Sequence, residues 1–261
     1  MMGKNKASAW NPQQYHKYQA YRSRPARDLI NQLPSDGVSS IVDLGCGPGD
    51  ITELLKARYP KADILGVDNS KPMLEAARQK YPEQTWLDQD IASTTGRFDL
   101  IFSNAALQWL PDHKKLLAGL FDCLNPGAYL AIQMPRNAEL LSHKLLTDTV
   151  ESFLNRFPQL KQHIRKNPVQ TPQEYFEIFS PLGALCDIWE TTYLHELIGD
   201  NPVLEWVKGS ALSPMRGTLS HAEYREFEQA YGKKLQAAYP KMPNGSTLFP
   251  FKRIFMVVKK A

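Results

Sequence analysis

The fold is decided by residues 43–49, which have the sequence Asp-Leu-Gly-Cys-Gly-Pro-Gly. An apolar segment, residues 41–44, leads into this stretch, and a helical pattern over residues 50–59 follows it, with Asp50 as the expected cap. Glycine lets the backbone turn tightly and approach a ligand closely because it has no Cβ. The N-terminus of the following helix offers free N–H groups and a partial positive charge. The stretch therefore predicts a strand, a ligand-binding turn and a helix.

Around this turn the chain alternates apolar runs with helical patterns, which is typical of βα units and a mainly parallel sheet. After residue 135 helical patterns dominate. We predict an α/β fold with a Rossmann-like, seven-stranded, mainly parallel sheet, helices on both faces, and a helical cover inserted in the C-terminal half. The expected strands are residues 41–44, 64–67, 85–87, 98–103, 129–134, 187–197 and 251–258. Residues 125–127, Asn-Pro-Gly, are expected to end a helix over residues 112–124.

The spacing of the glycines separates three kinds of nucleotide site. The NAD fingerprint G-x-G-x-x-G needs its third glycine one residue later, and the Gly-Lys-Ser/Thr ending of a P-loop is absent. The remaining pattern, an acid followed by Leu-Gly-x-Gly-x-Gly, resembles the signature of class I methyltransferases that use S-adenosylmethionine (SAM). This resemblance implies SAM as the cofactor and S-adenosylhomocysteine as its product.

Three further segments follow strands at the same edge of the sheet, where ligands bind in open parallel sheets. Asp68 lies about 20 residues after the turn and can accept both ribose hydroxyl protons. By resemblance, Asp90 and Ile91 contact adenine, and residues 103–109 face the methyl group. Each acid alone could instead be a helix cap or a surface charge. The predicted cofactor-binding residues are Tyr15, Asp43, Gly45, Gly47, Gly49, Asp68, Asn69, Met73, Asp90, Ile91, Asn104 and Leu107.

Six further segments are informative together: residues 10–15, 21–26, 104–113, 133–135, 189–193 and 249–255. They resemble segments of the trans-aconitate methyltransferases, and the resemblance covers nearly the whole chain. The resemblance implies methyl transfer to a carboxylate of trans-aconitate or a closely related small polycarboxylate, which gives a monomethyl ester. It also implies four parts: a lid with the first helix (1–36), a SAM-binding Rossmann-like core (37–136), a helical substrate cover with one sheet strand near 185–197 (137–247), and a final strand (248–261).

A carboxylate acceptor needs no general base, because its pKa near ~4 leaves it ionised at neutral pH. Arginines should hold the other carboxylates, since pairing the reacting oxygen would lower its nucleophilicity. We expect at least two of the candidate arginines to converge near the methyl group. Ser213 stands before Pro214, where we expect arginine in related enzymes, so either Arg216 has taken over this contact or the substrate differs. The predicted substrate-binding residues are Arg22, Trp109, Arg136, Tyr193 and Arg216.

Composition narrows the class of partner. The net charge of +4 is dispersed along the chain, whereas nucleic-acid enzymes concentrate basic residues, so we predict no nucleic-acid partner. No apolar run approaches the ~20 residues of a membrane span, and no closely spaced histidines suggest a metal. Three scattered cysteines fit a reducing cytoplasm, and we expect a monomer there. The alternatives are a malonyl-thioester methyltransferase that docks an acyl-carrier protein, a SAM-binding module without catalysis, and an RNA methyltransferase.

Overall fold

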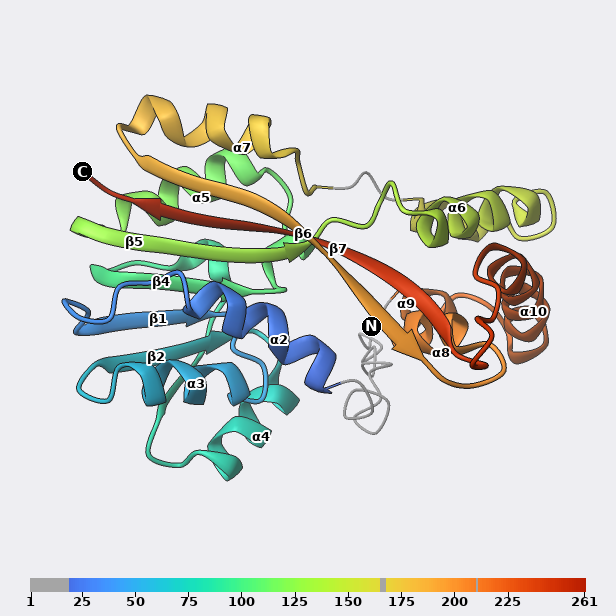
Figure 1. Cartoon of the computed structure of the whole chain (residues 1–261), viewed down its shortest axis with the longest axis horizontal. Coiled ribbons are helices and arrows are strands. Elements are labelled where there is room, and N and C mark those ends of the chain that lie inside the picture. The colour runs from blue at the N-terminus through green and yellow to red at the C-terminus, as the bar shows by residue number, and fades with distance from the viewer. Residues whose placement is uncertain (1–18, 165–167, 210) are drawn as a thin grey trace, which may run out of the picture. The chain divides into compact units, whose positions relative to one another are not determined.

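The computed structural model describes residues 19–164, 168–209 and 211–261, and the side chains of residues 19–22, 213 and 214 are outside the description (Figure 1). These residues form two compact units. We call the first the sheet unit, and its described residues are 22–136, 168–192 and 252–261. We call the second the helical unit, and its described residues lie within 19–21, 137–164, 193–209 and 211–251.

The described residues contain one seven-stranded sheet, with the strand order β3-β2-β1-β4-β5-β7-β6 (Figure 1). The pairs from β3 to β5 are parallel, and β7 is antiparallel to β5. Strand order reverses between β1 and β4, which is the point where ligands bind in folds of this kind. The predicted fold class is confirmed. The strands are β1 (Ser40–Leu44), β2 (Asp63–Asp68), β3 (Thr85–Asp88), β4 (Phe98–Asn104), β5 (Leu124–Pro135), β6 (Leu185–Leu197) and β7 (Thr247–Lys259).

Helices pack around the sheet because the central strands are buried on both faces, as their continuous apolar runs predict. Helix α7 belongs to this unit, whereas the sequence placed it in the helical cover. Its Tyr175 and Phe179 are completely buried, and Phe179 packs against Phe121 of α5. The helices are α2 (Gln19–Ile30), α3 (Asp50–Arg58), α4 (Lys71–Lys80), α5 (His113–Asp122) and α7 (Pro172–Phe179), with short 3-10 turns η1 (Ile91–Ser93), η2 (Leu107–Trp109) and η4 (Ser180–Leu182).

The helical unit has an apolar core of its own. Helix α10 contributes Tyr224, Phe227, Tyr231 and Leu235, whose spacing of three and four residues puts them on one helix face. Ser220 and Glu223 cap its N-terminus reciprocally. The other helices here are α6 (Leu141–Phe153), η3 (Pro158–His163), α8 (Pro202–Lys208) and α9 (Ser213–Arg216).

Two local expectations were wrong. Residues 125–127 do not end a helix: α5 ends at Asp122 and β5 has begun by Leu124, with Gly127 at a φ of 76°. Asp50 does not cap α3, because it is the first helical residue and Gly49, in the left-handed conformation, is the cap. Consequently no side chain within the described residues caps the N-terminus of α3.

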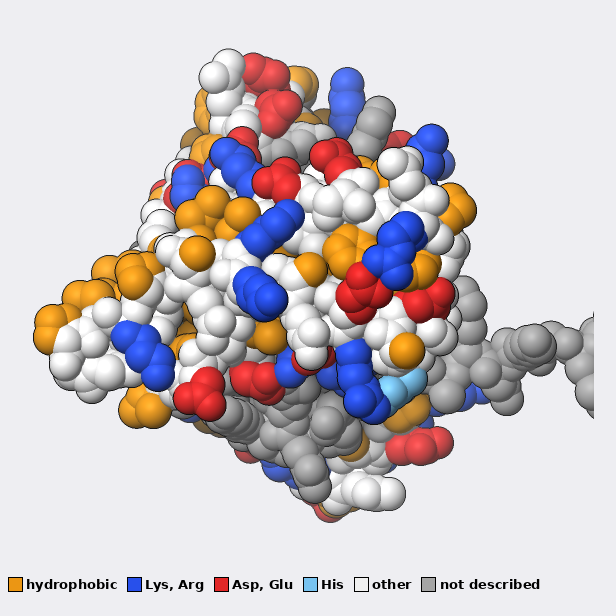
Figure 2. Space-filling view, turned by 90° about the vertical axis from the view of Figure 1, so that its right-hand side faces the viewer, with side chains coloured by type: hydrophobic (Ala, Val, Ile, Leu, Met, Phe, Trp, Pro, Cys, Tyr) orange, Lys and Arg blue, Asp and Glu red, His pale blue; other side chains and the backbone are white. Residues whose placement is uncertain are grey.

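The surface carries mixed charges. On the face shown in Figure 2, Lys and Arg side chains are interspersed with Asp and Glu side chains. Among the described residues, no helix is long and apolar enough to cross a membrane.

Candidate cofactor and substrate site

Three glycines shape the turn between β1 and α3, and they serve different purposes. Gly45, Gly47 and Gly49 have φ of 76°, 56° and 85°, in the left-handed region that favours glycine. A Cβ on Gly45 would lie 2.2 Å from the Cβ of Ala106, and one on Gly49 would lie 2.6 Å from the ring of Trp86. A Cβ on Gly47 would meet nothing within 4 Å. Only Gly47 therefore faces open space that a ligand can approach.

Asp68 connects the two turns that follow β1 and β2. One carboxylate oxygen accepts a hydrogen bond from Gly47 N at 2.9 Å, and the other accepts from Ser70 N at 2.8 Å. Each carboxylate oxygen can accept more than one hydrogen bond, so these contacts leave capacity for ligand hydroxyls. The structure thus brings the predicted ribose-binding acid onto the glycine turn.

Asp43 lies beneath the turn. It is 1% exposed and accepts a hydrogen bond from Oγ1 of Thr52 at 2.6 Å. Burial raises the pKa of Asp43 to about 7; the Thr52 bond lowers it and the negative charge of Asp68 raises it further. This position suits a carboxyl that supports the turn, and direct contact with the cofactor stays a prediction.

The proposed adenine-binding acid also has a structural use. Asp90 is exposed, and its Oδ1 accepts from Ala92 N at 2.8 Å, which caps η1. Ile91 lies beside the glycine turn, 3.7 Å from where a Cβ of Gly45 would be. Of the remaining predicted contacts, Asn69 is exposed and Met73 is half-buried at the start of α4. Their roles toward adenine and ribose stay predictions.

The loop after β4 is bent sharply at Ala105, which has a φ of 55°. Its N–H donates to the carbonyl of Gln133 on β5 at 2.8 Å, and its carbonyl accepts from Nε2 of Gln108 at 2.6 Å. Leu107 is completely buried in the core of the sheet unit. Asn104 is half-buried at the end of β4. The loop is thereby fixed next to the glycine turn by backbone and amide contacts.

A buried histidine that was not among the predicted site residues anchors η2. Nε2 of His113 is 3.0 Å from the Leu107 carbonyl, which can only accept, so this nitrogen carries the proton. Nδ1 then accepts from the hydroxyl of Tyr175 at 2.6 Å, and that hydroxyl accepts from Gln170 N at 3.2 Å. Burial lowers the pKa of His113, which keeps this neutral form in place.

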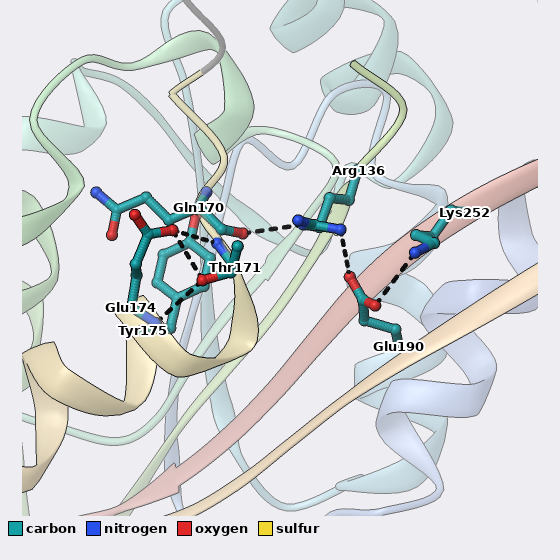
Figure 3. Close-up of polar contacts among 7 residues, drawn as sticks. All are labelled: Arg136, Gln170, Thr171, Glu174, Tyr175, Glu190 and Lys252. Atoms are coloured by element: carbon teal, nitrogen blue, oxygen red, sulfur yellow. Dashed lines mark hydrogen bonds and ion pairs between the residues drawn. The ribbon is translucent and has the colours of Figure 1, made fainter. Parts of the chain in front are cut away.

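The same network reaches Arg136, a predicted substrate-binding residue at the carboxyl end of β5 (Figure 3). Nε of Arg136 donates to the Gln170 carbonyl at 3.2 Å, and Nη1 lies 2.9 Å from a carboxylate oxygen of Glu190. Lys252 donates to the other oxygen of Glu190 at 3.3 Å. The Arg136 side chain is 12% exposed. A carboxylate of the protein thus contacts this arginine, and a substrate contact stays a prediction.

The other predicted substrate residues lie in different surroundings. Trp109 is 61% exposed, so it does not fill the core. In the helical unit, Tyr193 is buried and stacks on His195 with an interplanar angle of 9°. Arg216 is exposed, donates from Nε to the Tyr224 hydroxyl at 3.2 Å and lies over that ring.

The structure does not test two of the predicted residues or the predicted convergence of the arginines. Tyr15 and the side chain of Arg22 fall outside the described residues. Arg136 belongs to the sheet unit and Arg216 to the helical unit, so their predicted convergence stays a prediction.

Comparisons with known proteins bear on this arrangement. A family model described as a methyltransferase domain matches residues 18–183. The trans-aconitate 2-methyltransferase of Azoarcus sp. is 40% identical over 250 residues, which cover 95% of this chain and 98% of that protein. The chain belongs to the trans-aconitate 2-methyltransferase family. The enzyme of the same name from Sinorhizobium fredii is 39% identical over 97% of this chain and 99% of its own length.

Solved structures place the fold of this family member among methyltransferases. The YcgJ protein from Bacillus subtilis superposes with a TM-score of 0.60 at 16% identity, over 91% of this chain and 98% of that chain. Phosphoethanolamine N-methyltransferase 2 from Haemonchus contortus, solved in complex with S-adenosyl-L-methionine, gives 0.54 at 18% identity, over 91% of this chain and 53% of that chain. At these identities the likeness concerns the fold alone.

Two residues of this methyltransferase were missed as candidates. Gln133 and Arg253 lie in the apolar strands β5 and β7, and both are buried. The signal was present: each is a polar residue inside an apolar run, where burial without a partner is costly. In the described part of the chain, no cluster of three or more His, Cys, Asp or Glu side chains could hold a metal ion.

Proposed function

We propose that this protein transfers the methyl group of SAM to a carboxylate of trans-aconitate, giving a monomethyl ester and S-adenosylhomocysteine. The observation that carries the proposal is the relationship to the trans-aconitate 2-methyltransferases of Azoarcus sp. and Sinorhizobium fredii, at about 40% identity over nearly the full length of each protein. The alignments cover 95% and 97% of this chain, so the likeness extends through both units and beyond the cofactor-binding turn.

The residues present fit SAM. Gly47 leaves open space at the turn, the N-terminus of α3 begins at a glycine cap, and Asp68 sits against Gly47 with capacity for ribose hydroxyls. Bound SAM would supply an electrophilic methyl group on a positively charged sulfur. Gly47, Asp68 and Asp90 would hold its nucleoside part, and the loop at Asn104 would adjoin its methionine part.

The acceptor needs positioning rather than proton removal. A carboxylate oxygen attacks the methyl carbon, the carbon–sulfur bond breaks, and its electron pair stays on sulfur, so no proton is transferred. A carboxylic acid with a pKa near ~4 is already ionised at neutral pH. The protein must therefore align three atoms and exclude water. His113 is consistent with this, since both of its ring nitrogens are engaged inside the fold.

A small polycarboxylate also agrees with the charges of the candidate residues. Arg136 and Lys252 both contact the carboxylate of Glu190, which places two cationic side chains together at this edge of the sheet. Arg22 and Arg216 are further proposed contacts, and Ser213 marks the position where this chain departs from the expected arginine. The three cysteines are free thiols. Free thiols agree with a reducing cytoplasm, which we include in the proposal. That the protein is a monomer without nucleic-acid or membrane partners is a separate part of the proposal.

The test is transfer of labelled methyl from SAM to a panel of acids: trans-aconitate, cis-aconitate, isocitrate and a malonyl thioester. Selective labelling of trans-aconitate supports the proposal. Labelling of another acid alone would keep the chemistry and replace the substrate, and Arg216 with its neighbourhood would be the first place to look. Absence of labelling on every acid, with SAM bound, would refute the proposed activity.

A further inference from the structure

Three amide-bearing residues lie near the carboxyl ends of β4 and β5 and in the loop after β4, and each has a buried atom without a hydrogen-bond partner among the described residues. The atoms are Oδ1 of Asn104, Oε1 of Gln108 and Nε2 of Gln133. Ala105 links the three residues, because its N–H contacts the Gln133 backbone and its carbonyl accepts from Gln108. A buried polar atom without a partner is costly, so such a cluster indicates a ligand.

The orientation of the Gln133 amide is set by Arg253. Gln133 is 0% exposed, and its Oε1 accepts from Nη1 of Arg253 at 3.0 Å. A guanidinium can only donate, so the oxygen of Gln133 must face Arg253 and the N–H group must face away. The Nε2 atom of Gln133 is therefore a hydrogen-bond donor without an acceptor among the described residues. Arg253 is 4% exposed, and its positive charge strengthens that donor by polarising the amide.

The amide of Gln108 has the opposite orientation, with its oxygen rather than its nitrogen left without a partner. Its Nε2 donates to the Ala105 carbonyl, so its unpartnered Oε1 is an acceptor. Asn104 and Gln133 are register partners in parallel strands, so their side chains point to the same face of the sheet. The cluster thus presents acceptors on the β4 side and a donor on the β5 side.

Strand order shows which ligand each side would meet. The glycine turn follows β1, and the order away from it is β4, β5 and β7. Neighbouring strands are about 4.8 Å apart, so Gln133 and Arg253 lie roughly 10 and 15 Å from β1 across the sheet. The acceptors on the β4 side are next to the cofactor turn, where Ala106 packs on Gly45. The donor and the guanidinium lie farther from the glycine turn, a position that suits the methyl acceptor better than the cofactor.

We propose that the Gln133 amide N–H, supported by Arg253, binds a carboxylate of the methyl acceptor. The inference rests on the proposed function for the identity of that acceptor. Gln133 is the binding group and Arg253 is a positioning residue that orients it. The bound carboxylate is one that is not methylated, because a hydrogen bond to the attacking oxygen would weaken it as a nucleophile.

The decisive variant is Gln133→Glu. Glutamate keeps an oxygen for Arg253 and nearly the same shape, but it removes the N–H donor and adds a negative charge. Calorimetry with S-adenosylhomocysteine-loaded protein should show trans-aconitate binding weakened at least about tenfold, with S-adenosylhomocysteine affinity and melting temperature maintained. KM should rise more than kcat falls, because the contact exists in both the ground state and the transition state.

Gln173→Glu on α7 is the matched control: it makes the same substitution at an exposed position in the same unit, and acid binding should not change. Arg253→Lys keeps the charge without the planar fork, so it should weaken acid binding less than Arg253→Gln does. If Gln133→Glu does not fold, the comparison of Arg253→Lys with Arg253→Gln is the test. The proposal then requires that Arg253→Gln raises KM for the acid more than Arg253→Lys does, and that kcat changes less than KM in both variants.

The outcomes separate this inference from the proposed function. If the wild type binds an acid of the panel and Gln133→Glu binds it equally well, the amide site is wrong while the proposed function can stand. If the wild type binds an acid other than trans-aconitate and Gln133→Glu weakens it, the site holds and the substrate changes. If the wild type binds none of the acids, the site is wrong as well.

Discussion

At the scale of single residues, the glycines of the turn have separable functions that mutation can distinguish. Gly45→Ala would force a Cβ to within 2.2 Å of Ala106, so we expect a loss of stability of about 1–3 kcal/mol or more. Gly47→Ala meets no atom within 4 Å and strains only the backbone, at a cost of roughly 1 kcal/mol. Its Cβ would project into the proposed cofactor space, so SAM affinity should fall at least tenfold.

Chemical denaturation and calorimetry of the two variants test this contrast. If Gly45→Ala and Gly47→Ala lose the same stability and both bind SAM as wild type does, the open space at Gly47 is not the cofactor site. Gly127→Ala is the control for a left-handed glycine with open surroundings away from the turn, and it should lower stability without affecting SAM.

Asp43 makes stability depend on pH in a direction that is unusual for a carboxylate. Its folded pKa of about 7 exceeds its unfolded value of 3.8, so between these values the folded state binds more protons than the unfolded state. Stability from this group is therefore present below pH 4 and is lost as pH rises toward 7. Relative to wild type, Asp43→Asn should gain a few kcal/mol of stability between pH 4 and 7, at about 1.4 kcal/mol per pKa unit.

Asp99 supplies a control with the opposite sign. Burial alone would raise its pKa, but hydrogen bonds from Ser39 and Asn125 hold the pKa well below its usual range. Its contribution to stability is present above pH 4 and is lost in acid, so Asp99→Asn should be most damaging at neutral pH. The free energies of unfolding of wild type, Asp43→Asn and Asp99→Asn, measured across the pH range, test both pH dependences. Parallel curves for wild type and Asp43→Asn would contradict the pH dependence predicted for Asp43.

The sequence predicted single residues correctly where a backbone pattern defines their position. It did not predict which partner a polar side chain contacts. The glycine spacing located the turn, and Asp68 does lie against Gly47. Arg136 was selected by its position after β5, but its contact with Glu190 depends on a strand about 50 residues away in sequence. Gln133 was passed over although a polar residue inside an apolar strand is a signal, because the sequence pattern does not show which partner a buried amide will meet.

At the scale of elements, the hydrogen-bond chain from α7 through His113 to η2 holds the loop beside the proposed methyl site. Tyr175→Phe removes the donor to His113 and the acceptor for Gln170 N, which should cost about 1–3 kcal/mol. Because His113 then loses one fixed contact, η2 should move more freely and KM for the acid should rise.

Tyr231→Phe is the matched control, since this completely buried hydroxyl donates to the Ser142 carbonyl in the helical unit. It should lower stability similarly while KM is maintained. Equal kinetic effects of the two variants would indicate that α7 supports the fold alone.

The sequence predicted the type of most elements but misassigned where α7 packs. Its helical pattern was clear, yet its partner is α5, and the apolar residues Tyr175 and Phe179 do not reveal which surface they will meet. The start of β5 was missed for a related reason. An Asn-Pro-Gly run usually ends an element, but here Gly127 adopts a φ of 76° within a strand whose pairing to β4 shifts register after Phe98.

At the scale of the whole molecule, the net charge of +4 acts on a substrate that carries several negative charges. Association of opposite charges is faster at low ionic strength, and salt screens the attraction beyond about 10 Å at 0.1 M. We expect kcat/KM for a tricarboxylate to fall roughly 3- to 10-fold between low salt and 0.5 M, and to fall less for a monocarboxylate acceptor. SAM, whose net charge is positive, should not bind more weakly as salt increases.

The measurement is initial rate against ionic strength for acceptors of one, two and three carboxylates, with the melting temperature followed in parallel. A slope that steepens with acceptor charge would show that the protein's field contributes to capture, in addition to contacts such as the one proposed for Gln133. Identical slopes for all three acceptors would restrict recognition to short-range contacts. A parallel fall in melting temperature would instead attribute the salt effect to the fold, because surface ion pairs are screened by the same ions.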